Sequence, residues 1–299
     1  MVFSILFSAI ILFTGAFGIL NFLHMFQLNS YKPKEQIKWY LKNPYRILPC
    51  IVILTLGLIS AFLVYMLDNI AIVIAIIFLV ISLFFGLFLK PQKAKKPLVY
   101  TARVKRLLAT YVVVYGLIIL SVFLFGGMWT KLLITAIASG GIPLILLFCN
   151  LINKPIELSI NRHYINDAKR ILKSNKNLNI IGVTGSFGKT SVKFYLNTLL
   201  RAKYNVLATP ESYNTPLGIV RTVREKLKAT HQIFICEMGA RNVGDIKEIC
   251  DIVHPNHGVI TSIGEQHLET FKTLDNITNT KFELADSLSD NGMLFVNGD

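Results

Sequence analysis

A glycine-rich loop that ends in lysine and threonine carries the clearest chemical signal in this sequence. The loop follows a short apolar segment, residues 179–184, and precedes a stretch with helical spacing, residues 192–201. Backbone N–H groups of such a loop point toward phosphate oxygens, and the following helix adds its dipole. Val183 stands where the strict Walker pattern has glycine, but strand, loop and helix come in the required order. The pattern predicts a nucleotide site formed by Thr184, Gly185, Ser186, Phe187, Gly188, Lys189, Thr190 and Ser191.

Three side chains are the candidates for handling the triphosphate and its metal. We expect Lys189 to reach the β- and γ-phosphates and the Thr190 hydroxyl to bind Mg²⁺. Glu237 follows the apolar segment 231–236, and an acidic residue at the end of a buried strand can bind Mg²⁺ directly or through water. The ordinary alternative for Glu237 is a solvated carboxylate at a strand end.

Asn214 and Thr215 are candidate nucleotide-binding residues for a positional reason. They lie between a predicted strand, residues 204–209, and a predicted helix, residues 219–228. Ligands of open α/β sheets bind at the carboxyl ends of the strands, which is where this segment falls. Taken by itself, the segment also fits a polar turn that starts a helix.

Three segments together resemble the Mur ligase superfamily, the ATP-dependent amide-forming enzymes of cell-wall precursor synthesis and folylpolyglutamate synthesis. They are the phosphate loop 184–191, the sequence Glu-Met-Gly-Ala at 237–240 and the sequence His-Leu-Glu-Thr-Phe at 267–271. The resemblance covers about residues 156–299, and the last two segments are most similar to the ligases that add D-alanyl-D-alanine to a UDP-muramoyl tripeptide. It implies that Glu237 is a metal ligand and that Asn214 and Thr215 lie near the γ-phosphate.

Two further site residues rest on this resemblance alone. It implies that His267 binds a second Mg²⁺ and that Lys281 is carbamylated, which converts a cation into a carboxylate-like metal ligand. By their chemistry alone, His267 would be interpreted as a hydrogen-bonded polar histidine and Lys281 as a solvated lysine. Lys189, His267 and Lys281 are thus the predicted catalytic residues, and Thr190, Glu237, His267 and carbamylated Lys281 the predicted metal ligands.

The implied reaction uses ATP and Mg²⁺ to join a carboxylate to an amine through an acyl phosphate. The implied partners are a UDP-linked muramoyl peptide or similar carboxylate acceptor and an amino acid or dipeptide amine. The superfamily normally has a soluble substrate domain in front and a further domain behind, and neither is found here, so we expect the 299 residues alone to lack full ligase activity. The alternatives are another ligase of the superfamily, of the poly-γ-glutamate or folylpolyglutamate type, and a non-catalytic membrane-tethered nucleotide-binding scaffold. A transporter ATPase ranks last.

Apolar residues make up 53% of the chain and are concentrated before residue 150. A bilayer core requires about 20 apolar residues per helix. Five runs of this kind predict membrane helices at residues 2–23, 48–67, 70–89, 107–125 and 132–149. No Asp, Glu, Lys or Arg lies in the middle of a run, which favours an anchor over a transport pathway.

The net charge of +14 is explained by topology better than by nucleic-acid binding. Basic residues gather in the first and third loops, and such loops stay in the cytoplasm. These residues are Lys32, Lys34, Lys38, Lys42, Arg46, Lys90, Lys93, Lys95, Lys96, Arg103, Lys105 and Arg106. The pattern predicts an external N-terminus and a cytoplasmic C-terminal half. Four cysteines without metal-ligand spacing are predicted to be reduced.

The predicted architecture is a multi-pass α-helical membrane domain followed by an α/β P-loop domain with a mostly parallel sheet. The predicted boundaries are 1–150 for the membrane domain, 151–178 for a connecting helix and linker, and 179–299 for an incomplete ATP-binding domain. Strands are predicted at 179–184, 204–209, 231–236, 258–263 and 293–297, with helices at 155–172, 192–201, 219–228 and 274–288.

Overall fold

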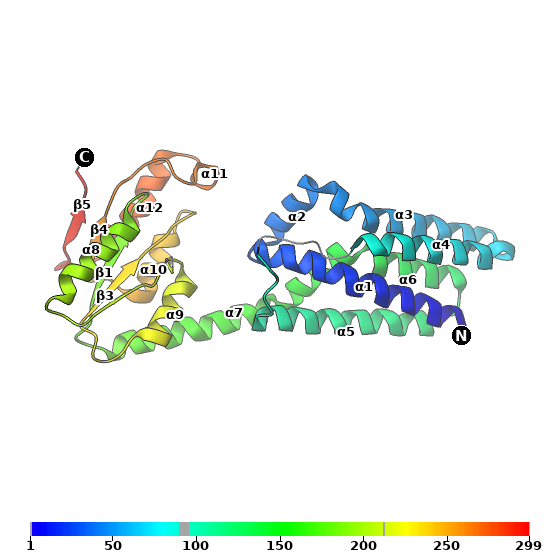
Figure 1. Cartoon of the computed structure of the whole chain (residues 1–299), viewed down its shortest axis with the longest axis horizontal. Helices are drawn as coiled ribbons and strands as arrows, with labels where there is room; N and C mark the ends of the chain where they lie inside the picture. Colours follow the sequence, from blue (N-terminus) through cyan, green and yellow to red (C-terminus); the bar gives the residue numbers. More distant parts are fainter. Residues whose placement is uncertain (1, 90–95, 212, 299) are drawn as a thin grey trace. The chain divides into compact units, whose positions relative to one another are not determined.

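The computed structural model describes residues 2–89, 96–211 and 213–298 (Figure 1). Lys90, Lys93 and Lys95 of the predicted basic loop lie outside these residues. The chain divides into two compact units, Met1–Glu157 and Leu158–Asp299. One continuous helix, α7 (Ile142–Ser174), runs through the division, so the stretch predicted as a connecting helix and linker begins inside a longer helix.

The first unit is a bundle of helices. In chain order they are α1 (Val2–Leu28), α2 (Pro33–Lys42), α3 (Pro44–Met66), the 3₁₀ turn η1 (Asp68–Ile70), α4 (Ala71–Gly86), the 3₁₀ turn η2 (Leu87–Leu89), α5 (Ala102–Leu124), α6 (Met128–Gly140) and the start of α7. Five helical segments of the described chain are long and apolar enough to cross a membrane, namely Val2–Leu28, Pro44–Met66, Ala71–Leu89, Ala102–Leu124 and Ile142–Ser174. Helix α2 occupies the stretch predicted to be the first loop.

The prediction of a single fifth helix over residues 132–149 is wrong. The chain breaks between α6 and α7 at Gly141. Glycine is a poor helix former, and Pro143 has no N–H to continue the hydrogen-bonding pattern. The Tyr115 hydroxyl donates a 2.7 Å hydrogen bond to the carbonyl of Ala138, which satisfies a backbone group near the break.

Small residues bring α3 and α6 into close contact. A Cβ at Gly140 would lie 2.6 Å from the Cys50 carbonyl oxygen, and a Cβ at Gly57 would collide with Ala136. Small residues that allow backbones to approach are typical of helix packing in membranes, where hydrophobic burial between helices contributes little.

The second unit is built on a parallel five-stranded sheet with the order β2-β3-β1-β4-β5. The strands are β1 (Asn179–Thr184), β2 (Val206–Ala208), β3 (Ile233–Glu237), β4 (His257–Ile260) and β5 (Leu294–Val296). The helices are α8 (Lys189–Arg201), α9 (Pro216–Lys226), α10 (Asp245–Val253), α11 (Leu268–Phe271) and α12 (Leu274–Asp286). The prediction of a parallel α/β sheet is confirmed, and α10 and α11 are additional elements.

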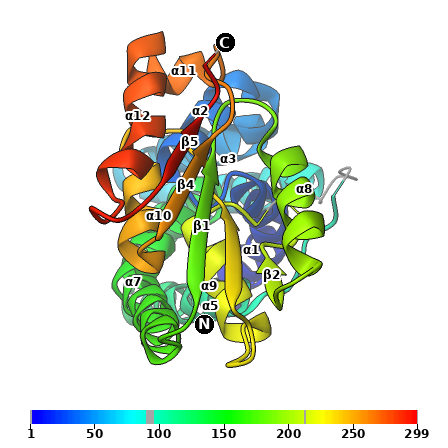
Figure 2. The same cartoon turned by 90° about the vertical axis from the view of Figure 1, so that its left-hand side faces the viewer.

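Helices cover both faces of the sheet (Figure 2). Apolar side chains on each face explain these two layers. On one face Val183 and Ile235 pack beneath Val192 and Leu196 of α8. The other face is covered by α9, α10, α12 and the polar end of α7, which share a second apolar cluster. Since all strands are parallel, the loops after β1, β3 and β4 meet at one edge, beside the N-terminus of α8.

Candidate functional site

The loop between β1 and α8 has the conformation of a phosphate cradle. Gly185 and Gly188 have φ angles of +144° and +80°, a backbone region that residues other than glycine rarely adopt. A Cβ at Gly185 would also collide with the Thr261 hydroxyl. Helix α8 begins at Lys189, so its N-terminal N–H groups and its dipole face the loop. The arrangement suits a phosphate anion.

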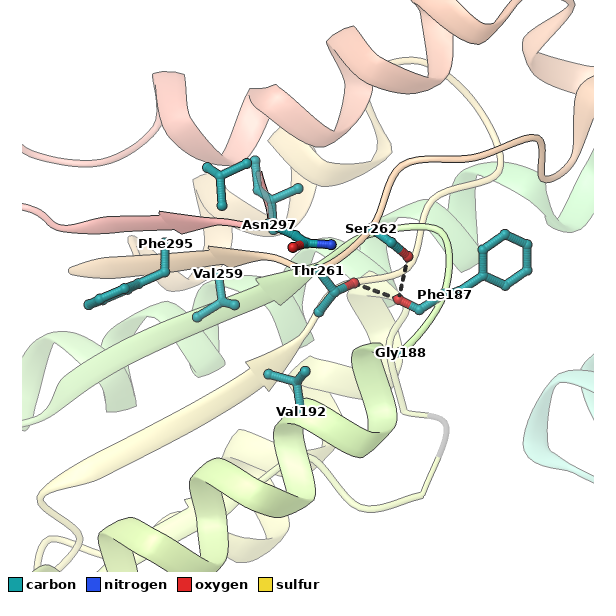
Figure 3. Close-up of a pocket in the computed structure, with 10 residues that line it drawn as sticks. Phe187, Gly188, Val192, Val259, Thr261, Ser262, Phe295 and Asn297 are labelled. Carbon is teal, nitrogen blue, oxygen red and sulfur yellow. Dashed lines mark hydrogen bonds between the residues drawn. The ribbon is translucent and has the colours of Figure 1, made fainter. Parts of the chain in front are cut away.

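The segment after β4 fixes this loop from the side. The backbone N–H of Ser186 donates to the Ser262 carbonyl oxygen at 2.6 Å, and the Ser186 hydroxyl donates to the Gly264 carbonyl oxygen at 2.9 Å. Thr261 and Ser262 donate their hydroxyls to the Phe187 carbonyl oxygen at 2.6 and 3.2 Å (Figure 3). The Phe187 side chain itself is exposed, as is Ser191.

Lys189 lies over the loop that precedes it. Its Nζ donates to the carbonyl oxygens of Gly185 at 2.7 Å and Ser186 at 2.9 Å. Burial lowers the pKa of the Lys189 ammonium, and the negative charge of Glu237 acts in the opposite direction. The ammonium is therefore held where phosphate oxygens would lie, and its two carbonyl contacts are ones that a bound phosphate can replace.

Glu237, at the end of β3, is the centre of a buried polar network. Its side chain is 2% exposed. The Thr190 hydroxyl lies 3.2 and 3.1 Å from its two carboxylate oxygens, and Asn214 Nδ2 donates to Oε1 at 3.1 Å. Thr209 accepts a 3.1 Å hydrogen bond from the Glu237 backbone N–H. The predicted residues Thr190, Asn214 and Glu237 are thus brought together.

The donor set fits Mg²⁺ by its chemistry and its spacing. Mg²⁺ binds oxygen ligands at about 2.0–2.1 Å in octahedral geometry, so neighbouring ligand oxygens lie about 2.8–3.0 Å apart. The oxygens of Thr190 and Glu237, one hydroxyl and one carboxylate, lie 3.1 Å apart. No group of three His, Cys, Asp or Glu side chains that could hold a metal exists in residues 2–89, 96–211 and 213–298. A metal here therefore requires further ligands, which phosphate oxygens and water would supply.

Asn214 and Thr215 have different roles at this edge. The Asn214 carbonyl oxygen accepts a 2.8 Å hydrogen bond from the Gly239 N–H, so both its backbone and its side chain contact the β3 end. The Thr215 hydroxyl accepts a 3.3 Å hydrogen bond from Gly218 and caps the start of α9. Thr184 similarly uses its hydroxyl within the protein, donating to the Met238 carbonyl oxygen at 3.2 Å.

His267 and Lys281 lie within electrostatic reach of the phosphate loop. Burial, and then the charges of Arg241, Lys281 and Lys189, lower the pKa of the His267 imidazole. His267 itself has a φ angle of 55° and stands at the start of α11. Burial, and then the charge of Lys189, lower the pKa of Lys281 to about 8. A lysine with a pKa of about 8 is partly neutral near neutral pH, and the neutral amine is the form that carbamylation requires.

Lys193 is a site residue that the sequence-based prediction missed. It lies in α8, one helical turn after Thr190, and its Nζ is 2.9 Å from Glu237 Oε2. Its side chain is 1% exposed. Its spacing of three residues from Thr190 is the one available signal, because residues three apart share a helix face.

A pocket of about 480 Å³ adjoins the phosphate loop on the α8 face of the sheet (Figure 3). Its apolar walls include Val192, Val259 and Phe295, and its polar groups include Asn297 and Ser262. The volume and the mixture of apolar walls with a few polar groups are typical of small-molecule sites.

Comparison with known proteins finds relatives for the second half of the chain. Residues 183–299 match the Mur ligase middle domain. A UDP-N-acetylmuramoyl-tripeptide–D-alanyl-D-alanine ligase from Mycobacterium leprae is 38% identical over 122 residues, which are 41% of this chain and 23% of that protein. The ligase of the same name from Bacillus subtilis is 34% identical over 120 residues, 40% of this chain and 26% of that protein.

Among solved structures, MurF ligase from Thermotoga maritima in complex with ADP aligns with a TM-score of 0.44 and 33% identity. That alignment covers 46% of this chain and 32% of the Thermotoga chain. The chain thus spans about a quarter of the length of the curated relatives it matches. The resemblance predicted from three short motifs is confirmed.

Proposed function

We propose that this chain, whose residues 183–299 belong to the Mur ligase middle domain family, supplies the ATP-binding and phosphoryl-transfer part of a membrane-anchored amide-forming ligase. The observation that carries the proposal is the contact of Thr190 with Glu237, at 3.1 Å, beside the loop that Lys189 covers. Backbone N–H groups that can bind phosphate, a pair of metal-binding oxygens and the Lys189 ammonium thereby lie together at one edge of the sheet. The adjoining pocket would receive the nucleoside.

The proposed chemistry has two steps. A carboxylate oxygen of the acceptor attacks the γ-phosphorus of ATP, the bond to the β-phosphate oxygen breaks, and ADP leaves. An amine then attacks the carbonyl carbon of the acyl phosphate, the carbon–oxygen bond breaks, and inorganic phosphate and one proton leave.

This chain's residues contribute mainly positioning and charge, which dominate catalysis of phosphoryl transfer. The N–H groups of the Gly185–Gly188 loop orient the phosphates. Lys189 turns from its two carbonyl contacts to the β- and γ-phosphates. Thr190 and Glu237 would hold Mg²⁺, which would offset negative charge on the phosphate oxygens. The charge of unmodified Lys281 lowers the pKa of His267, so carbamylation of Lys281 would remove this effect.

The proposed substrates are a UDP-muramoyl tripeptide and D-alanyl-D-alanine, as the names of the relatives suggest. The purified full chain would be incubated with Mg·ATP, each acceptor and each amine, and ADP release would be followed. Release that requires the muramoyl acceptor supports the proposal, and release with folates or glutamate chains instead supports another ligase of the family. Nucleotide binding without release under any acceptor agrees with the scaffold alternative and also with the expectation that these 299 residues alone lack full ligase activity.

We further propose that the helical unit is embedded in a membrane. Large apolar side chains cover its outer surface, for example Leu117 on α5, which is 62% exposed, and Leu41 on α2, which is 75% exposed. Exposed apolar surface on this scale is unusual for a protein in water. On α2, the lysines at four-residue spacing (Lys34, Lys38 and Lys42) accompany the exposed Ile37 and Leu41, as in helices that lie at an anionic membrane surface.

The proposed topology has the N-terminus outside, five crossings and the sheet unit in the cytoplasm, with α6 and the start of α7 forming the last crossing. Cysteines substituted at Asn69 and Lys42 test it, because the four native cysteines are buried. In intact cells a membrane-impermeant maleimide should label Asn69→Cys and should label Lys42→Cys only after permeabilisation. The reverse labelling pattern would indicate the opposite topology. Equal labelling of the two variants in intact cells would contradict a membrane location.

A further inference from the structure

A fully buried ion pair connects the phosphate-loop helix to the metal-binding carboxylate. Lys193 Nζ lies 2.9 Å from Glu237 Oε2, and the two side chains are 1% and 2% exposed. Burying two charges is costly unless each is paired and hydrogen-bonded, so such a pair has to be held in a fixed geometry. The proposed phosphoryl transfer assigns no step to Lys193.

The surroundings of Lys193 hold its ammonium in place. Its Nζ also donates a 2.6 Å hydrogen bond to the carbonyl oxygen of Glu211 and lies 5.2 Å from the centre of the Phe194 ring. The other carboxylate oxygen of Glu237 accepts hydrogen bonds from Asn214 and Thr190. The charge of Glu237 is therefore matched by groups of the protein itself.

The wider site carries an excess of positive charge. In the described part of the chain, the end of β3 and the phosphate loop hold two cations for one carboxylate. Glu237 is paired with Lys193, and the Lys189 ammonium lies on the Gly185 and Ser186 carbonyl oxygens of the loop. This positive surplus repels a divalent cation that approaches by itself and attracts a polyphosphate anion.

We propose that Lys193 is a resident counter-ion that prevents Mg²⁺ from binding by itself, so that the metal enters only together with the nucleotide phosphates. The inference rests on the proposed nucleotide site and adds the order of binding. Lys193 is a positioning residue, since it touches Glu237 and the Glu211 carbonyl rather than the nucleotide. Phosphate charge offsets the surplus, and the Thr190 and Glu237 oxygens then accept the metal that the phosphates carry.

Direct metal binding tests this role without any measurement of turnover. Free Mn²⁺ would be titrated into the detergent-solubilised full chain and followed by its electron paramagnetic resonance signal, first alone and then with ADP. The wild-type chain should leave Mn²⁺ free at concentrations that saturate the site when ADP is present. Lys193→Met removes the counter-charge and should bind Mn²⁺ alone on the order of tenfold more tightly than wild type.

Two further variants keep the test decisive. Lys203→Met removes an exposed lysine just after α8 and should leave Mn²⁺ binding unchanged. Lys193→Gln retains an amide that can donate hydrogen bonds to Glu237 and Glu211 but lacks the charge, so it should behave as Lys193→Met does. It replaces Lys193→Met if the latter does not fold.

The outcomes separate this inference from the proposed function. The counter-ion role is overturned if the wild-type chain binds Mn²⁺ as tightly without ADP as with it. It is also overturned if neither Lys193 variant binds free Mn²⁺ more tightly than Lys203→Met does. If the wild-type chain fails to bind ADP in the presence of Mn²⁺, the proposed nucleotide site fails as well. Mn²⁺ binding that needs ADP in wild type but not in the Lys193 variants supports both.

Discussion

Replacing Lys281 with methionine should make the sheet unit more stable at neutral pH. The Lys281 side chain is 2% exposed, and burial and the charge of Lys189 lower its pKa from 10.5 to about 8. The unfolded chain keeps the higher pKa, so between these two values it binds more protons than the folded chain. The buried ammonium lowers the free energy of unfolding at neutral pH, and this loss disappears as the pH rises from about 8 to 10.5. Methionine has a similar unbranched shape and carries no charge.

The magnitude follows from the difference between the two pKa values. Each pKa unit corresponds to about 1.36 kcal/mol, so the charged Lys281 costs about 3 kcal/mol at pH 7 and about 2 kcal/mol at pH 9. Lys281→Met should gain close to these amounts, with the gain shrinking as the pH rises. Bicarbonate should stabilise wild type but not the variant if carbamylation occurs.

Urea unfolding followed by pulse proteolysis is the suitable assay. Both tryptophans, Trp39 and Trp129, belong to the helical unit, so intrinsic tryptophan fluorescence does not report on the sheet. Lys226→Met, on the exposed surface of α9, is the matched control and should change stability by less than about 0.5 kcal/mol at every pH. A Lys281→Met variant that is less stable than wild type at pH 7, or a gain that does not depend on pH, would refute the reasoning.

Three other substitutions have equally direct outcomes. Lys189→Ala should abolish any acceptor-dependent ADP release that the wild-type chain shows, while leaving the urea midpoint of the sheet unit within experimental error of wild type; release at the wild-type rate would contradict its assigned role. Gly185→Ala forces a side chain onto a φ of +144° and against Thr261, so calorimetry should show nucleotide affinity reduced by more than about tenfold. Gly57→Leu would overpack the contact with Ala136, and should lower the thermal midpoint of the helical unit, measured by tryptophan fluorescence, by an amount equivalent to about 1–3 kcal/mol; an unchanged midpoint would show that α3 and α6 do not pack as described.

Much of the sheet unit could be predicted because its signals are local. Residues 179–184 form β1 as predicted, since an apolar run followed by a glycine loop fixes both ends of the strand. Glu237 was identified from its place after an apolar run, and β3 ends at that residue. Parallel strands then bring Thr190 and Glu237 to one edge without further information.

The remaining features depend on contacts between distant segments. Lys193 looks like a solvent-exposed lysine on an amphipathic helix, but in the fold it is buried against Glu237 of β3 and the carbonyl oxygen of Glu211. Gly140, Gly141 and Pro143 favour the break after α6, but glycine and proline also occur within continuous membrane helices. Tyr115, far away in the sequence, stabilises that break by its hydrogen bond to Ala138.

A crystal structure of the full chain with Mn²⁺ and a non-hydrolysable ATP analogue would test the central claim most directly. The triphosphate should lie on the N–H groups of Gly185–Lys189, and the anomalous signal of manganese should fall between the Thr190 hydroxyl, the Glu237 carboxylate and the phosphate oxygens. A nucleotide bound elsewhere on the chain, or a manganese ion out of reach of both Thr190 and Glu237, would contradict it.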